Sequence, residues 1–293
     1  MRTSRIAILI AVGAISLPLL ASPASAIGAK SRTTVPIGKQ LAELKGSDTV
    51  AADGFGVSVA ISGTTVMVGA PGYGKSAGRA YLFARSGAIW NQTVELKGSD
   101  TVAGDYFGYS VVVSGTTAVV GSPGYAKTAG RAYVFTDTTS GWKQTAVLKG
   151  SDTGANEGFG YSLAISGATA LVGAPVYTKN AGRAYVFTDT SSGWKQAAEL
   201  KGSDTVAADG FGISVVISGA TAIAGAPDHA KQSGRAYVFT TTASGWKQAA
   251  ELKGSDTVAE DGFGVSVVIS GTTVVVGAPD RAKDAGQAYL FKA

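Results

Sequence analysis

A period of 52 residues runs through this chain and restricts the folds open to it. The dipeptide Phe-Gly recurs at that interval, at Phe55, Phe107, Phe159, Phe211 and Phe263. Gly-Ala-Pro keeps the same register at Gly69, Gly173, Gly225 and Gly277, and Gly-Ser-Pro takes its place at Gly121. Repeats three and four, aligned from Leu148 and Leu200, agree at 37 of 52 positions. Self-similarity at one fixed spacing predicts a stack of like units.

Each unit carries the pattern of four short strands. In the first repeat Val57, Val59 and Ile61 alternate with small residues, and a Ser-Gly-Thr turn leads into a second apolar run at Val66. After Gly-Ala-Pro we expect a loop of about eight residues, a third strand around 80–83 and a fourth at 89–96. The first strand is small or apolar on both faces, which suits a sheet covered on both sides. The pattern predicts an all-β protein, a β-propeller of five antiparallel four-stranded blades, and favours it over a β-solenoid.

The two ends of the chain predict how this ring closes. The fifth repeat stops after its third strand, at Ala293, and residues 39–46 match 247–254, the fourth strand of an earlier repeat. We therefore expect strand 39–46 to complete the last blade, which removes the open sheet edges. This blade should be the weakest, because Gly38 stands where the other repeats carry Trp. An open arc that pairs with a second chain satisfies the same strand count.

The first 26 residues have the pattern of a cleaved secretory signal. Two arginines precede an apolar run at 6–20, and Ala24-Ser25-Ala26 is a small-residue cleavage site. The run is shorter than the roughly 20 residues that span a bilayer. We therefore predict a secreted or extracytoplasmic protein cleaved after Ala26, with a leader at 27–36, the propeller at 37–293 and no membrane span.

Composition removes several kinds of chemistry. The chain has no Cys and one His, which excludes disulfides, thiol catalysis and multi-histidine metal sites. Removing Arg2 and Arg5 from the 25 Lys and Arg leaves 23 against 20 Asp and Glu, a net charge of +3 that predicts no nucleic-acid partner. No singular set of acid, base and nucleophile stands out. The sequence therefore predicts a protein that is not an enzyme and has no catalytic residue.

The register of Phe-Gly, Gly-Ala-Pro and a following Gly-Arg-Ala-Tyr over residues 37–293 resembles the FG-GAP repeats of the integrin α-chain propeller and of exported bacterial proteins. The resemblance implies a propeller used for extracellular ligand binding or cell adhesion, through the loops before the first strand and after the second. Two features depart from it. Integrin propellers have seven blades, and their calcium loops carry Asp-x-Asp-x-Asp-Gly where this chain has only Ser62-Gly63-Thr64-Thr65.

The loop entering the first strand of each unit carries two acidic residues. The pairs are Asp48 and Asp53, Asp100 and Asp105, Asp152 and Glu157, Asp204 and Asp209, and Asp256 and Asp261. Carboxylates are hard ligands of the kind calcium takes, so these pairs raise the hypothesis of a metal site. Two carboxylates are too few for a full shell, and Asp-Gly is a common turn signal, so a structural role is favoured and no cofactor is predicted.

Basic residues gather in the loop between the second and third strands, on the same predicted face. They are Lys75, Lys127, Lys179, Lys231 and Lys283, followed by Arg79, Arg131, Arg183 and Arg235, with Gln287 ending the series. A ring of like charge can attract an anionic glycan or other polymer. Pairing of each base with an acid of the same face is the favoured alternative, because acids and bases are nearly equal in number.

Aromatic residues fall into two groups. The series Tyr81, Tyr133, Tyr185, Tyr237 and Tyr289 lies in the third strand and Trp90, Trp142, Trp194 and Trp246 in the fourth; both are predicted to fill gaps between blades. Tyr73, Tyr125 and Tyr177 lie in the basic loop itself, which makes them candidates for ligand contact, and His229 is expected to be a substitution in that loop.

These features favour an exported binding or adhesion module. Its partner would be an extracellular protein or a glycan or other anionic polymer, met by the charged loops of a monomer. A repetitive target would strengthen a weak site that is present five times. The alternatives are a structural component of a cell envelope layer and, behind it, a hydrolase or lyase with an unrecognised site.

Overall fold

The computed structural model describes residues 38–293, and antiparallel strands make up most of it. The predicted signal segment 1–26 and leader 27–36 lie outside the described residues. Five sheets follow one another along the chain, and we number them blades 1 to 5. The predicted four-stranded unit is confirmed in blades 1 to 4, whereas blade 5 has three strands.

The same elements recur in every blade. Blade 1 contains β1 (Ser58–Ser62), β2 (Thr65–Ala70), α1 (Tyr73–Ser76), β3 (Arg79–Ser86) and β4 (Ile89–Leu96). Blade 2 contains β5 (Ser110–Ser114), β6 (Thr117–Ser122), α2 (Tyr125–Thr128), β7 (Arg131–Thr138) and β8 (Gly141–Leu148). Blade 3 contains β9 (Ser162–Ser166), β10 (Thr169–Ala174), α3 (Tyr177–Asn180), β11 (Arg183–Thr190) and β12 (Gly193–Leu200). Blade 4 contains β13 (Ser214–Ser218), β14 (Thr221–Ala226), α4 (His229–Gln232), β15 (Arg235–Thr242) and β16 (Gly245–Leu252). Blade 5 contains β17 (Ser266–Ser270), β18 (Thr273–Ala278), α5 (Arg281–Asp284) and β19 (Gln287–Lys292).

Within a blade the strands lie in chain order and pair antiparallel. The first hairpin closes with Ser62 opposite Thr65, and Gly63 in the turn has φ +56°, a conformation that glycine adopts without a steric penalty. A shift of register between Leu82 and Phe83 marks a β-bulge against the fourth strand, and it recurs in blades 2 to 4. Because successive side chains point to opposite faces, the apolar runs give each sheet two apolar faces.

The apolar core lies between neighbouring blades. Ala60, Met67 and Leu82 of blade 1 pack against Val111 and Val120 of blade 2, and equivalent clusters join each following pair of blades. The phenylalanine of the Phe-Gly motif is fully buried in each of these joints, at Phe107, Phe159, Phe211 and Phe263. The prediction that Tyr81, Tyr133, Tyr185 and Tyr237 are core residues is confirmed, since all four rings are fully buried.

Neighbouring backbones also touch at each joint. Gly182 forms a parallel bridge with Phe211, whose N–H donates to the carbonyl of Ala181 at 3.1 Å. Gly182 has φ +81°, and an added Cβ would lie 2.5 Å from the amide nitrogen of Phe211. The glycine of Gly-Arg-Ala-Tyr is therefore required by both its conformation and this close approach.

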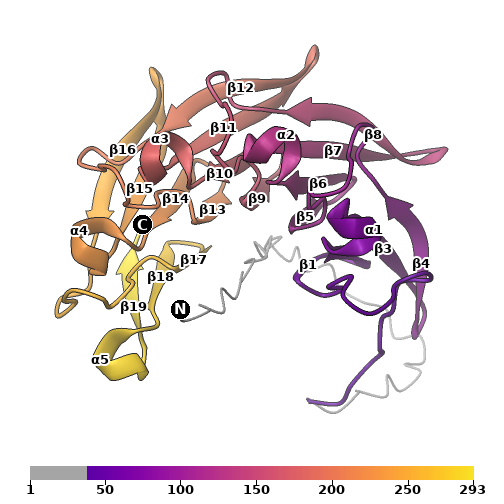
Figure 1. The fold of residues 1–293 in the computed structure, drawn as a ribbon, viewed down its shortest axis with the longest axis horizontal. Helices are drawn as coiled ribbons and strands as arrows, with labels where there is room; N and C mark the ends of the chain where they lie inside the picture. The colour runs from indigo at the N-terminus through magenta and orange to yellow at the C-terminus, as the bar shows by residue number, and fades with distance from the viewer. Residues whose placement is uncertain (1–37) are drawn as a thin grey trace, which may run out of the picture.

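The five blades stand side by side in an open arc (Figure 1). The expected closing strand is not formed: residues 39–46 contain no strand, and β19 has no fourth neighbour. The reason lies in how the segment is anchored. Leu44 packs on the end of blade 1 and the Ser47 N–H donates to Gln92 of β4, while β19 lies across the opening of the arc.

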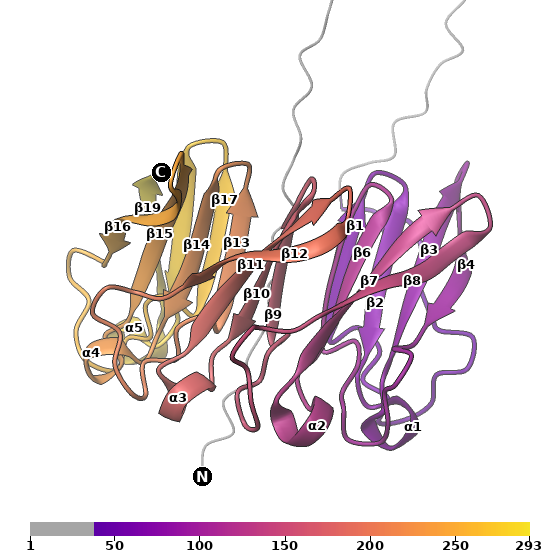
Figure 2. The same cartoon turned by 90° about the horizontal axis from the view of Figure 1, so that it is seen from above.

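The helical turns α1 to α5 all lie along one edge of the arc, and the turns of the first hairpins lie along the other (Figure 2). The sequence predicted plain loops at these five positions. Each turn spans four residues and contains left-handed backbone, such as Lys75 at φ +61°, so it cannot extend into a longer helix. Among the described residues no helix has the length and apolar character needed to cross a membrane.

Candidate functional site

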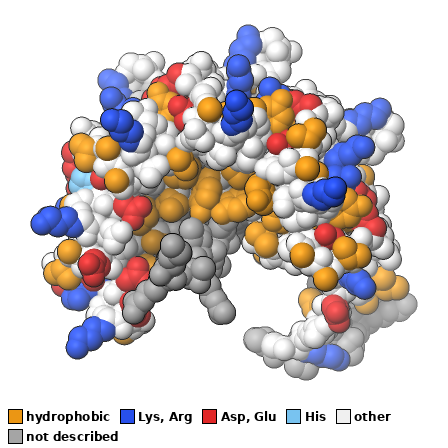
Figure 3. All heavy atoms as spheres, viewed as in Figure 1, with side chains coloured by type: hydrophobic (Ala, Val, Ile, Leu, Met, Phe, Trp, Pro, Cys, Tyr) orange, Lys and Arg blue, Asp and Glu red, His pale blue; other side chains and the backbone are white. Residues whose placement is uncertain are grey.

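The edge that carries α1 to α5 brings together nearly every charged residue that the sequence singled out. We call this edge, with its helical turns and the loops that enter the first strands, the loop face. Figure 3 looks onto it and shows Lys and Arg side chains projecting around the arc, with acidic side chains between them and apolar side chains lining its inner wall. The predicted gathering of acids and bases on one face is thus present.

The first acid of each pair is an anchor for buried tyrosines. The hydroxyl of Tyr81 donates to Asp48 at 2.8 Å, and the same bond occurs in the other four blades. Burial, followed by the bond to Asp48, raises the pKa of Tyr81 far above its usual range. The bond from Tyr73 is the main cause that lowers the pKa of Asp48, since it favours the charged carboxylate. This acid therefore links the loop to the core of its blade.

The second acid holds the loop's own backbone. Asp53 accepts a hydrogen bond from the N–H of Val50 at 2.7 Å, and its side chain is almost wholly buried. Asp105, Asp209 and Asp261 make the same bond and are equally buried, and Glu157 substitutes in blade 3. Such an Asx-type contact fixes a tight turn.

The acidic pairs do not assemble a metal shell. Their oxygens already accept bonds from tyrosine hydroxyls and backbone N–H groups. Within the part of the chain that the structure describes, no group of three or more acidic, His or Cys side chains is placed to hold a metal ion. The arrangement supports the structural role that the sequence favoured for Asp48, Asp53, Asp100, Asp105, Asp204, Asp209, Asp256 and Asp261.

The arginines are held by neighbouring acids. In blades 1, 3 and 4 the pairs are Arg79–Glu95, Arg183–Glu199 and Arg235–Glu251, at 2.5 to 2.6 Å. In blade 2 Val147 replaces the glutamate, and Arg131 bonds Asp100 at 2.7 Å instead. Sequence reasoning missed these glutamates, although their recurrence at the 52-residue interval was a usable signal.

The loop tyrosines also face inward to this network. Tyr73, Tyr125 and Tyr177 donate to the anchor acids at 2.6 to 2.9 Å. An arginine covers each ring, with the guanidinium carbon 4.0 to 4.7 Å from the ring centroid. Such cation–π contacts occupy the ring face that a ligand would use. The structure therefore gives these tyrosines and arginines partners within the chain.

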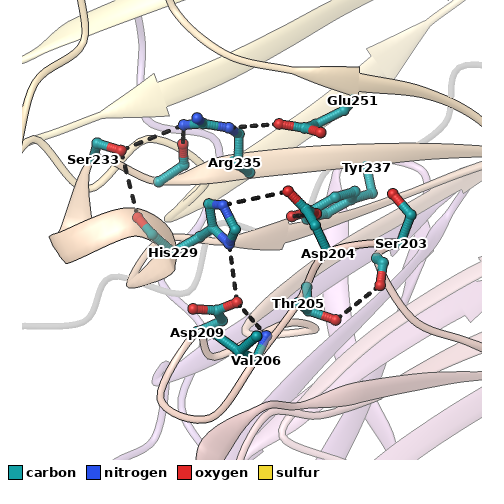
Figure 4. A network of polar contacts seen from close by, with 12 residues as sticks. Ser203, Asp204, Thr205, Val206, Asp209, His229, Ser233, Arg235, Tyr237 and Glu251 are labelled. Atoms are coloured by element: carbon teal, nitrogen blue, oxygen red, sulfur yellow. Dashed lines mark hydrogen bonds and ion pairs between the residues drawn. The ribbon is translucent and has the colours of Figure 1, made fainter.

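Blades 4 and 5 replace the loop tyrosine by a base that does similar work. His229 Nδ1 lies 2.9 Å from Asp209 and its Nε2 lies 3.6 Å from Asp204, so the ring stands between two carboxylates (Figure 4). Arg281 bonds Asp256 at 2.9 Å and approaches Asp261 at 3.4 Å. The expectation that His229 is a loop substitution fits this position, and its bridge between two acids is an added feature.

The five loop lysines differ from all of these residues. Lys75, Lys127, Lys179, Lys231 and Lys283 are exposed, and every ion pair among the described residues involves Arg or His rather than Lys. The favoured expectation of a fully paired rim thus holds for the arginines and fails for the lysines.

The backbone that carries each lysine is firmly held. All five have left-handed φ, between 56° and 61°. In the first four blades the lysine carbonyl accepts an N–H from the next blade's entering loop, for example from Ala208 to Lys179 at 2.9 Å. The next loop therefore clasps each helical turn, and the lysines project from fixed positions.

Exposed valines lie on the same loops and were not singled out from the sequence. Val50, Val102, Val206 and Val258 are 57 to 73% exposed, and each follows the anchor acid by two positions. Blade 3 has Gly154 at this position. The loop face therefore offers both positive charge and small apolar contacts.

The fold and this repeated face define a class, that of β-propeller repeat proteins. A family model described as FG-GAP repeat matches residues 39–83, 90–135, 142–187, 194–239 and 246–291. These matches cover most of the chain, which therefore belongs to the FG-GAP repeat family. A search of curated proteins found no match.

Proposed function

We propose that this protein is a non-catalytic, secreted binding module that holds anionic extracellular polymers on its loop face. FG-GAP repeats suggest a propeller of the binding or adhesion type. The observation that carries the finer proposal is the set of five exposed lysines that stand outside the ion pairs of the described residues.

Charge and geometry support this choice of ligand. The acids of the face are partly or fully buried and bonded to tyrosines, backbone or arginines, so the lysine ammonium groups are the charges most accessible to a partner. A polymer that repeats its own anionic groups can touch several blades at once, and linked weak contacts add to a strong one through effective concentration.

The test compares two triple variants of equal charge. The first replaces Lys127, Lys179 and Lys231 by Ala on the loop face; the control replaces Lys143, Lys195 and Lys247, which are exposed on the outer strands of the same three blades. Binding to a sulfated and a carboxylated polysaccharide is measured by biosensor at low and moderate salt, with neutral dextran as reference and with a chelator arm. A lysine–anion contact at the surface contributes up to about 1 kcal/mol, so we expect the first variant to bind at least about tenfold more weakly.

Binding should also weaken steeply with salt, because exposed charges are screened. Equal loss in both triple variants would contradict a specific role for the loop face. Binding that disappears with chelator would return the ligand to the acidic loops, and failure to bind either polymer would remove the proposal.

A further inference from the structure

The four joints between blades use one set of contacts. At each joint the phenylalanine N–H of the following blade donates to the residue before the bridge glycine, at 3.1 to 3.3 Å, from Phe107 to Ala77 through Phe263 to Ser233. A buried serine of the preceding blade donates to the glycine carbonyl of the next at 2.7 Å, as Ser110 does to Gly160. The joint therefore has a preceding half and a following half, each of which can be recognised.

Blade 5 carries a preceding half with nothing against it. Ser266 and Gly286 correspond to Ser110 and Gly130 of blade 2, and no following blade receives them. The apolar face is uncovered as well. Leu290 is 71% exposed, whereas its counterpart Val134 is fully buried, and Val268 and Val275 are also less buried than their counterparts Val112 and Val119.

Blade 1 carries the following half, likewise without a partner. Val59 and Ile61 are 55% and 42% exposed, whereas their blade 2 counterparts Val111 and Val113 are 0% and 7% exposed. Among the described residues the N–H groups of Ala52 and Phe55 donate no backbone hydrogen bond, although their counterparts in the other blades do. Ala52 nevertheless has φ 72°, the conformation in which Ala208 clasps the preceding turn.

We propose that the two ends of the arc bind each other within one chain and form a fifth joint, with residues 39–44 as the fourth strand of blade 5. The register follows from blade 4, where Ala236 faces Leu252, Val238 faces Ala250 and Phe239 faces Gln248. By the same offsets Ala288 faces Leu44, Leu290 faces Ala42 and Phe291 faces Gln40.

The occupant of each end is the opposite end of the same chain for two reasons. The arc already encloses most of a ring, so a second arc continuing its curvature would run into the first (Figure 1). Leu44 and Asp48 are also in place on blade 1 as their counterparts are on other blades, so a blade 5 that docks there meets strand 39–44 directly.

Closure demands little of the existing joints. The blades are joined closely along their inner strands β1, β5, β9, β13 and β17, whereas the outer strands β8, β12 and β16 touch one another only slightly. A change of angle about the inner strands can therefore narrow the opening while the buried contacts persist. The gain is burial of apolar surface on both ends, at roughly 25 cal/mol per Å².

A disulfide tests the proposed register, because the natural chain has no cysteine. The variant carries Ala42→Cys and Leu290→Cys; the matched control carries Ala250→Cys and Val238→Cys, an observed cross-strand pair. Residues opposite each other in an antiparallel pair have Cα atoms about 4.5–5.5 Å apart, within disulfide reach. Both proteins are oxidised at micromolar concentration and examined by intact mass and peptide mapping.

We expect both variants to form their disulfide within the monomer. Disulfide-linked dimers of the Ala42→Cys, Leu290→Cys variant would assign the ends to a second copy and overturn the proposal. Free thiols in that variant, under conditions that oxidise the control, would overturn it equally.

Hydrogen exchange on the unaltered chain covers the case in which the cysteine variant does not fold. In a closed ring the amides of 40–44 exchange as slowly as those of 248–252, to within about tenfold. Exchange of 40–44 at the rate of an unstructured peptide would refute closure. Both experiments are independent of polymer binding, so either proposal can fail alone.

Discussion

Replacing Gly182 by Ala tests whether the joints hold the blades through direct backbone contact. In the structure its φ is +81° and an added Cβ would lie 2.5 Å from the amide nitrogen of Phe211. The control is Gly167→Ala, in the turn between β9 and β10, where φ is +56° and no heavy atom lies within 4 Å of an added Cβ. Both changes place Ala in left-handed backbone, and only one enters a joint.

The expected magnitudes differ accordingly. The left-handed conformation costs a non-glycine residue about 1–2 kcal/mol, which is the whole expected effect at Gly167. At Gly182 the clash involves backbone, so no side chain can rotate away, and overpacking adds about 1–3 kcal/mol. Displacing the bridge also removes the bond from Phe211 to Ala181, about 1 kcal/mol. Gly182→Ala should therefore cost about 3–6 kcal/mol.

The assay is urea unfolding followed by fluorescence of the four tryptophans, with circular dichroism as a second probe. The midpoint of the Gly182→Ala variant should fall well below that of Gly167→Ala, at a similar slope. Midpoints that differ by less than the equivalent of about 1 kcal/mol would refute the argument that this contact governs the joint.

Gly286→Ala extends the comparison to the chain's end. In the open arc the nearest atom to its added Cβ is the Pro279 carbonyl oxygen at 3.1 Å. In a closed ring the same Cβ would meet Phe55 as those of the internal glycines meet the following blade. A cost close to that of Gly182→Ala would support the fifth joint, and a cost close to that of Gly167→Ala would speak against it.

Three further outcomes are expected. Ser162→Ala removes a buried donor to the Gly212 carbonyl and should cost about 1–3 kcal/mol in thermal or urea unfolding, whereas Ser166→Ala, which removes an exposed bond to Gly219, should cost less than about 1 kcal/mol; equal costs would contradict the buried role. Tyr185→Phe removes the bond to Asp152 and should cost about 1–2 kcal/mol, less than a fully buried ionic bond because Asp152 is exposed; an unchanged midpoint would contradict this. The bond from Tyr73 lowers the pKa of Asp48, so its stabilisation is present above the ordinary value near 3.8 and is lost as pH falls through the lowered pKa; the stability difference between wild type and Tyr73→Phe should therefore be largest above about pH 5 and shrink below about pH 3, and a difference that grows in acid would overturn the assignment.

The sequence predicts the blade almost completely because each of its signals is local. Alternating small and apolar residues set the strands, the glycine at Gly63 sets the first turn, and the 52-residue spacing counts the units. The β-bulge beside Phe83 and the left-handed turn at Lys75 carry no comparable local signal, since Lys and Ala are ordinary residues elsewhere. Their conformation depends on the strand or loop that packs against them.

The angle between blades is the quantity that the sequence leaves open. It depends on how Phe107, Met67 and Val111 share one layer, a non-local property that the spacing of motifs does not contain. Strand count and matching ends therefore predict a closed ring, while the structure leaves the ends apart. The contacts missing at those ends are the ones that the four internal joints make.

The division of labour on the loop face follows from reach rather than from charge. Arg79 stands at the start of β3, beside Glu95 of β4, so its guanidinium finds an acid within its own blade. Lys75 lies one turn earlier, in left-handed backbone, and its side chain extends past these acids into solvent. Equal totals of acid and base thus produce a face that is neutral in sum and positive at its tips. A ligand that approaches from outside meets the tips first, which is why the lysines, rather than the arginines or tyrosines of the same loops, are the residues to change.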